Sequence, residues 1–373
     1  MKKKLLFLMF IMATLMPQAS SAQELYVDFQ GNYKGKVLEI LSEEIQNLFG
    51  ADYTIQKLSA EILEGPEKGD VVEMENDFQP LEKGDAFYFN HNVFIDGGES
   101  YFVTAVARQG ALFLLLSIFV VAVILFGRWQ GVRSLIALIT SFLAIIYVLI
   151  PGILSGWSPL VASSLIAAVI LFAAIFFTHG FNRESLVAYT GTISAVFLTG
   201  IFALFAVSIT KLSGFAAEEA VYLNFNTGGA LNFTSLLLGA FIIGFLGVLD
   251  DIAVTQAAVV TELYGSNPKM KRREVYNRAM RIGREHVGAL VNTLVLAYTG
   301  ASLPLLLYMN YSTAGIMTNI NLEIFATEIV RIIVGSVGLI LTVPIVTILA
   351  VIYLKNYSRK GAAKSHHHHH HSH

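Results

Sequence analysis

The fold is decided by the apolar run at residues 238–264, which reads LGAFIIGFLGVLDDIAVTQAAVVTELY. It belongs to a segment from Leu231 to Tyr264 that would be about 50 Å long as a straight helix, well beyond the roughly 30 Å hydrocarbon core of a bilayer. Two adjacent carboxylates, Asp250 and Asp251, stand near its middle. A charge at the bilayer centre costs at least about 2.5–3.5 kcal/mol, so acids at this depth indicate a functional site.

The composition of the whole chain also favours a membrane protein. Of 373 residues, 55% are hydrophobic and only 14% are charged, whereas about 25% charged residues is usual in soluble domains. So much apolar surface does not fit inside one soluble core, which excludes a purely cytosolic protein and a disordered one. The chain has no Cys, which excludes a disulfide scaffold, thiol catalysis and a Cys-ligated metal.

Seven long apolar segments predict a polytopic α-helical membrane domain at 109–357. They lie at 110–127, 134–155, 159–178, 185–209, 232–263, 287–309 and 327–355. If the part before them is exported, 14 basic residues fall in inner loops, and only Arg108 and Lys211 lie outside near the membrane. The positive-inside rule then predicts a protein of the cytoplasmic membrane with an extracytoplasmic N-terminal domain and a cytoplasmic C-terminus.

The two ends of the chain are predicted to lie outside the mature fold. Residues 1–22 read as a signal peptide, because three Lys precede the apolar run Leu5–Met16 and small residues end at Ala22. A first transmembrane helix is the alternative, but that run is too short to span a bilayer. Residues 358–373 form a tail that contains an expression tag, six consecutive His at 366–371.

Residues 23–108 are predicted to form a small all-β barrel of the OB or SH3-like type. Short apolar runs alternate with turn signals such as Gly31-Asn32. The segment holds 17 acidic and 6 basic residues, a net charge of −11. This charge either concentrates cations near the membrane or serves solubility alone. No basic and aromatic stripe is present, so nucleic acid is not an expected partner. The expected strands are Leu25–Phe29, Lys36–Ile40, Tyr53–Leu58, Val71–Met74, Ala86–Phe89 and Tyr101–Val106.

The candidate site is a polar seam around the two acids. Gly244 and Gly247 precede them and predict a broken helix, a feature that transporters use to expose helix ends at mid-membrane. Asp251 is the expected principal ligand or proton carrier, and Asp250 and Asp251 together could hold a metal cation. An anion held by helix N–H groups and by Arg331 or Arg183 remains open, as does a purely structural ion pair with Arg331. The full predicted pathway comprises Asp250, Asp251, Thr255, Gln256, Glu262, Asn292, Thr293, Thr299 and Arg331.

Several of these residues lie in motifs that resemble the YibE/F-like family of bacterial multi-pass membrane proteins. The resemblance rests on Gly247-Val248-Leu249-Asp250-Asp251-Ile252-Ala253-Val254-Thr255-Gln256, on Arg284-Glu285-His286-Val287-Gly288, on Val291-Asn292-Thr293-Leu294 and on Ala297-Tyr298-Thr299-Gly300-Ala301. It covers the whole mature chain and implies the architecture, a β domain followed by helices. It implies no particular substrate.

Three functional hypotheses follow. The first is a secondary transporter, an exporter or exchanger of a small ion such as a metal cation, Na⁺, H⁺ or phosphate. The second is a membrane sensor or scaffold, which predicts a dry bundle with Asp250 or Asp251 in a salt bridge. The third, a membrane enzyme, is disfavoured because the chain has no P-loop, no H-E-x-x-H and no G-x-S-x-G motif. We expect no cofactor, and the expected partners are the lipid bilayer and a small ion or polar solute, with the oligomeric state left open.

Overall fold

The computed structural model describes residues 27–48, 51–94 and 98–355. The chain divides into two compact units, one up to Phe119 and the other from Val120. The predicted signal peptide at 1–22 and the tail at 358–373 lie outside the described residues.

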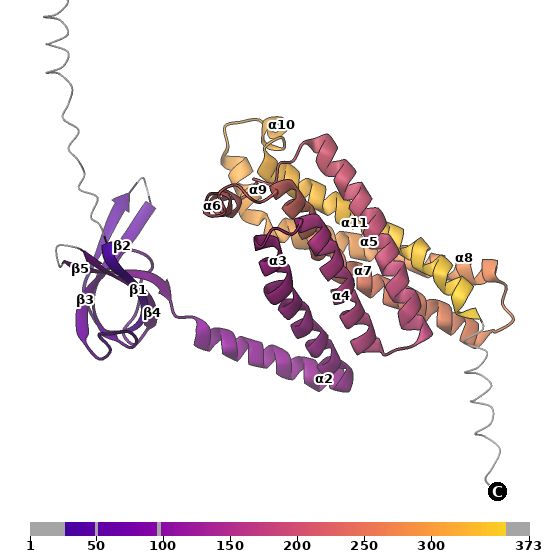
Figure 1. The fold of residues 1–373 in the computed structure, drawn as a ribbon, viewed down its shortest axis with the longest axis horizontal. Coiled ribbons are helices and arrows are strands. Elements are labelled where there is room, and N and C mark those ends of the chain that lie inside the picture. The colour runs from indigo at the N-terminus through magenta and orange to yellow at the C-terminus, as the bar shows by residue number, and fades with distance from the viewer. Residues whose placement is uncertain (1–26, 49–50, 95–97, 356–373) are drawn as a thin grey trace, which may run out of the picture. The chain divides into compact units, whose positions relative to one another are not determined.

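The first unit contains a closed five-stranded β-barrel, which confirms the predicted all-β fold (Figure 1). Its strands close in the order β1-β2-β3-β5-β4, and all neighbours are antiparallel except β3 and β5. Nine buried apolar residues fill the interior, among them Leu58, Phe87 and Phe89. The strands are β1 (Val27–Leu48), β2 (Ala51–Ile62), β3 (Val71–Asn76), β4 (Ala86–Phe94) and β5 (Glu99–Val106).

The described part of the first predicted strand and the whole of the second belong to one long strand, β1. The expected turn at Gly31-Asn32 is instead part of the ladder, where Gly31 pairs with His91 of β4. A strand this long must bend to follow a small barrel, and β1 does so through register shifts near Val37 and Ile40. The backbone of β1 packs closely against the Phe87 ring at Gly35. A Cβ atom at this position would lie only 2.9 Å from that ring.

The second unit is a bundle of helices. Asn232 caps α7 by accepting a hydrogen bond from the Ser235 N–H at 2.8 Å, and Asn182 caps α5 in the same way. The helices are α2 (Gln109–Ala144), α3 (Ile150–Leu154), α4 (Pro159–His179), α5 (Arg183–Thr210), α6 (Glu218–Asn226), α7 (Phe233–Ser266), α8 (Arg272–Ala301), α9 (Leu303–Tyr311), α10 (Ile316–Asn319) and α11 (Glu323–Tyr353), with a π-helical turn η1 (Ile145–Leu149) between α2 and α3.

Helix α2 reverses direction at Arg128. This residue has φ 49° and ψ −136°, outside the helical region. Beyond the reversal, Gly131 lies against the backbone carbonyl of Val123, a contact that a straight helix cannot make between residues eight positions apart. The predicted segments 110–127 and 134–155 are therefore two arms of one helical stretch, Gln109–Leu154.

Within the described residues, five helices are long and apolar enough to cross a membrane, or six if α8 and α9 form one span bent by 62°. The predicted number was seven. The difference arises because Gln109–Leu154 is counted as one stretch although it reverses at Arg128, between the two predicted segments, and because the predicted segment 287–309 is interrupted at Ser302, between α8 and α9.

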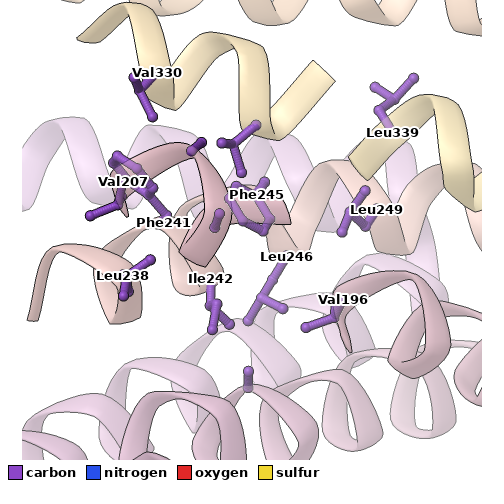
Figure 2. Close-up of a cluster of buried hydrophobic side chains, with 14 of the residues drawn as sticks. Val196, Val207, Leu238, Phe241, Ile242, Phe245, Leu246, Leu249, Val330 and Leu339 are labelled. Carbon is purple, nitrogen blue, oxygen red and sulfur yellow. The ribbon is translucent and has the colours of Figure 1, made fainter. Parts of the chain in front are cut away.

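Helix α7 is the centre of the bundle and contacts α4, α5, α8 and α11. Its buried face presents Phe241, Phe245 and Leu249 to side chains of the neighbouring helices (Figure 2). Small residues let the helices approach closely, as expected for membrane bundles. A Cβ atom on Gly338 of α11 would lie 2.7 Å from the Thr199 hydroxyl of α5.

Candidate functional site

A cavity of about 600 Å³ lies beside α7 in the helical unit. Its walls come from the part of α2 after the reversal, from η1, from the second half of α4 and from the middle of α7. Most of the lining is apolar. The polar and charged lining residues are Ser134 and Ser141 of α2, Thr178 and His179 of α4, and Asp250, Asp251 and Thr255 of α7.

Both carboxylates lie deep along the helix axis. Asp250 and Asp251 are about 25 Å from either end of α7 at 1.5 Å per residue. Asp250 is half-buried and Asp251 is exposed to the cavity. Successive helical side chains point about 100° apart. The two carboxylates therefore lie side by side along one wall and do not converge on a single point.

One carboxylate oxygen at this site has no partner. Oδ1 of Asp250 is buried and accepts no hydrogen bond. Among the described residues, neither Asp250 nor Asp251 is in a salt bridge. A buried polar atom left in this state costs roughly 1–3 kcal/mol, so the oxygen needs a proton, a water molecule or a cation from the cavity.

One end of the cavity adjoins tightly packed helices. There, an apolar cluster that includes Leu149, Ile153 and Ile166 fills the space between η1, α3 and α4. On the same side, Gly239 of α7 lies against the Ser163 side chain of α4, so closely that no Cβ atom would fit. Ile145, Ile170 and Ile243 belong to both the cluster and the cavity wall. From this cluster, the cavity lining runs along α7 past Asp250 and Asp251 to Ser134 of α2 and His179 of α4.

The predicted helix break is absent. Helix α7 is continuous from Phe233 to Ser266, although Gly244 and Gly247 lie in its middle. An unbroken helix satisfies its own backbone groups, which lipid cannot do. Gly247 instead lines the cavity, and Gly244 faces Tyr298 of α8, whose hydroxyl would lie 3.4 Å from a Cβ atom at this position.

The structure places Gln256 in the bundle interior instead of the cavity. Its side chain is buried, and its Nε2 donates to the Ala279 carbonyl at 3.0 Å and to the Thr347 hydroxyl at 2.8 Å. These bonds link α7 to α8 and α11. This geometry indicates a structural residue.

Arg331 is also away from the cavity. It donates a hydrogen bond to Glu328 at 2.6 Å on its own helix, and its guanidinium lies 5.6 Å from the Phe241 ring and 5.9 Å from the Tyr298 ring. The structure therefore does not support the predicted counter-charge for Asp250 or Asp251, because the charge of Arg331 is already matched by Glu328.

The remaining predicted pathway residues do not line the cavity either. Asn292 and Thr293 are exposed on α8, where the Thr293 hydroxyl donates to the Ala289 carbonyl of the preceding turn. Thr299 is half-buried nearer the end of α8, and Glu262 is exposed four residues before the end of α7. Of the predicted set, the structure brings together Asp250, Asp251, Thr255 and Gly247.

Sequence reasoning missed the opposite wall of the cavity. Ser134 and Ser141 lie seven residues apart, which places them on one face of α2, and Thr178 and His179 end α4. The helical spacing of the two serines was the available signal. Their convergence on α7 depends on the reversal at Arg128, which the sequence marks only by the neighbouring Gly127 and Gly131.

These features define the class of protein: a helical membrane domain with an acid-lined cavity, joined to a β-barrel. Residues 115–356 match the family model described as YibE/F-like protein, and the chain belongs to this family. No curated protein and no solved structure matches the chain.

Proposed function

We propose that this protein is a secondary transporter that moves a small cation or protons through the cavity beside α7. The observation that carries the proposal is the unpartnered oxygen of Asp250, buried in the wall of a cavity beside the middle of α7. Acids at the bilayer centre are costly unless a mobile cation, a proton or water compensates them, and ion pathways are where such acids occur.

The lining favours positive ions over anions. Asp250 and Asp251 are acidic, and the cavity is lined by no Lys or Arg among the described residues. An anion such as phosphate would be repelled by the carboxylates, and the unbroken α7 offers it no helix N–H groups. We therefore place Na⁺ and H⁺ first among the ions to test, with Asp250 and Asp251 as ligands or proton carriers.

We further propose that the cavity faces the cytoplasm. If the barrel is extracytoplasmic, and each arm of α2 and each other long helix crosses once, the chain has seven spans and α4 ends inside with His179. The Ser134 and His179 side of the cavity lies towards that end, and the apolar cluster around Leu149 and Ile166 lies towards the outer end. Alternating access would then separate α2 and α4 from α7 on the outer side.

The sensor or scaffold hypothesis is less well supported. It predicts a dry bundle with at least one of the two acids in a salt bridge. The described residues instead give Asp250 and Asp251 a cavity and no salt bridge, with His179 in the same lining. We propose transport without a catalytic step, so no cofactor is required.

The test is ion flux in proteoliposomes. Purified protein is reconstituted, a Na⁺ or pH gradient is imposed, and flux is followed with radioactive Na⁺ or an enclosed pH dye. We expect Asp250→Asn and Asp251→Asn each to reduce flux, and the double variant to abolish it. Glu219→Gln removes one negative charge from exposed helix α6 and should behave as the unchanged protein.

Monodisperse elution in detergent shows that each variant is folded. A folded double variant that moves Na⁺ and H⁺ as fast as the unchanged protein would overturn the proposal. A flux of Na⁺ without H⁺, or the reverse, identifies the ion.

A further inference from the structure

The barrel brings together three side chains with the chemistry of metal ligands. Glu67 lies in the turn between β2 and β3, His91 on β4 and Glu99 at the start of β5. His91 pairs directly with Tyr101 across the β4–β5 ladder, and Glu99 is two residues from Tyr101 on the same face. One ligand atom from each of Glu67, His91 and Glu99 lies within 4.8 Å of the others.

The imidazole of His91 points into this cluster. Its side chain is only 7% exposed, and its buried Nε2 has no hydrogen-bond partner among the described residues. That nitrogen lies 3.6 Å from Oε2 of Glu99 and 3.9 Å from Oε1 of Glu67. Both distances are too long for a hydrogen bond. A buried nitrogen between two carboxylates is costly to leave unpaired, so the geometry calls for a positive species between them.

Tyr101 holds the two carboxylates in place. Its hydroxyl lies 2.8 Å from Oε2 of Glu99 and 3.0 Å from Oε2 of Glu67, and its ring stacks on His91 with centroids 4.6 Å apart. A phenol has one proton and can donate it to only one carboxylate at a time, which leaves the other available.

We propose that Glu67, His91 and Glu99 bind a divalent transition-metal ion of the Zn²⁺ type. Zn²⁺ accepts imidazole nitrogen and carboxylate oxygen at about 2.0–2.2 Å, which places tetrahedral ligand atoms about 3.4 Å apart. The His91–Glu99 and His91–Glu67 separations of 3.6 and 3.9 Å need to shorten by only a few tenths of an ångström. Ca²⁺ and Mg²⁺ prefer oxygen ligands alone, so His91 selects against them.

This site is independent of the transport proposal, because it lies within the barrel and uses no residue of the helical unit. The two carboxylates carry a charge of −2, so one divalent ion neutralises the cluster. A fourth position remains for water or for a group from another molecule, as in zinc sites with three protein ligands. Tyr101 is the positioning residue of the site.

The test measures Zn²⁺ bound to the full chain without residues 366–371, since six consecutive His would themselves bind the metal. Equilibrium dialysis followed by elemental analysis gives the stoichiometry and the dissociation constant. We expect one Zn²⁺ per chain, lost in His91→Gln and weakened at least tenfold in Glu67→Gln and Glu99→Gln. Tyr101→Phe should weaken binding about 10–100-fold, as is typical for groups that orient ligands.

Glu82→Gln is the matched control, because it removes one exposed carboxylate from the same barrel and should bind Zn²⁺ as the unchanged protein does. Co²⁺ provides a second readout: visible absorption typical of a four-coordinate site should appear in the unchanged protein and vanish in Glu99→Gln. Equal Zn²⁺ binding in the unchanged protein, Glu67→Gln and Glu99→Gln would overturn the proposal. So would one-to-one Zn²⁺ binding that excess Ca²⁺ displaces.

Discussion

Replacement of Gln256 tests whether this residue stabilises the fold or takes part in transport. In Gln256→Met the side-chain volume is nearly kept, but both hydrogen bonds to Ala279 and Thr347 are lost. At about 0.5–1.5 kcal/mol each, two bonds stabilise the fold by about 1–3 kcal/mol, and the average of about 0.6 kcal/mol measured for bonds between membrane helices favours the lower end. For a unit of this size, about 1 kcal/mol corresponds to about 2–4 °C in melting temperature.

The expected result is a melting temperature about 2–12 °C lower in mild detergent, measured by the loss of the monomer peak in size-exclusion chromatography after heating. Ion flux per folded molecule at 20 °C or below should not change. Thr261→Val is the matched control, since the Thr261 hydroxyl bonds only to Ala257 on its own helix. An unshifted melting temperature together with altered ion selectivity would refute our assignment of Gln256 and return it to the pathway.

Three further predictions follow from the helical unit. Gly338→Leu should prevent recovery of monodisperse protein because its side chain would meet α5, whereas Gly300→Leu, with open space around its Cβ position, should be tolerated. Because the chain contains no Cys, Thr255→Cys in the cavity should react with a membrane-impermeant maleimide only from the cytoplasmic side; labelling only from the opposite side would contradict the proposed orientation. Arg331→Gln should destabilise the fold more than Arg331→Gln combined with Glu328→Gln, with a coupling of about 0.5–3 kcal/mol in a double-mutant cycle; additive effects would show that the pair does not interact.

The location of the long helices could be predicted from the sequence because hydrophobic length is a strong signal. What failed was the continuity within segments, since the predicted segment 287–309 is interrupted at Ser302. The gap left between the predicted segments 110–127 and 134–155 does contain a reversal, at Arg128 directly after Gly127. Conversely, Gly244 and Gly247 suggested a break where α7 is continuous, because neighbouring helices and the internal hydrogen bonds support the backbone.

Only those site residues could be predicted whose charge has a high free-energy cost inside a membrane. Asp250 and Asp251 could be predicted because a charged carboxylate has a high free energy in an apolar environment. Gln256 and Arg331 look equally polar in the sequence, but each finds its partners within the bundle, and only the coordinates reveal those partners. The cluster around His91 escaped prediction because its ligands come from separate strands and a turn, with no fixed spacing.

The unbroken course of α7 past Asp250 has a consequence for selectivity. If the protein carries ions as proposed, an ion beside α7 would meet side chains and water there, because no carbonyl or amide group of this helix is released at that depth. Such an ion would keep most of its hydration shell. The binding of a hydrated ion depends far more on its charge than on its radius. Li⁺, Na⁺ and K⁺ should therefore compete with one another at this position almost as equals.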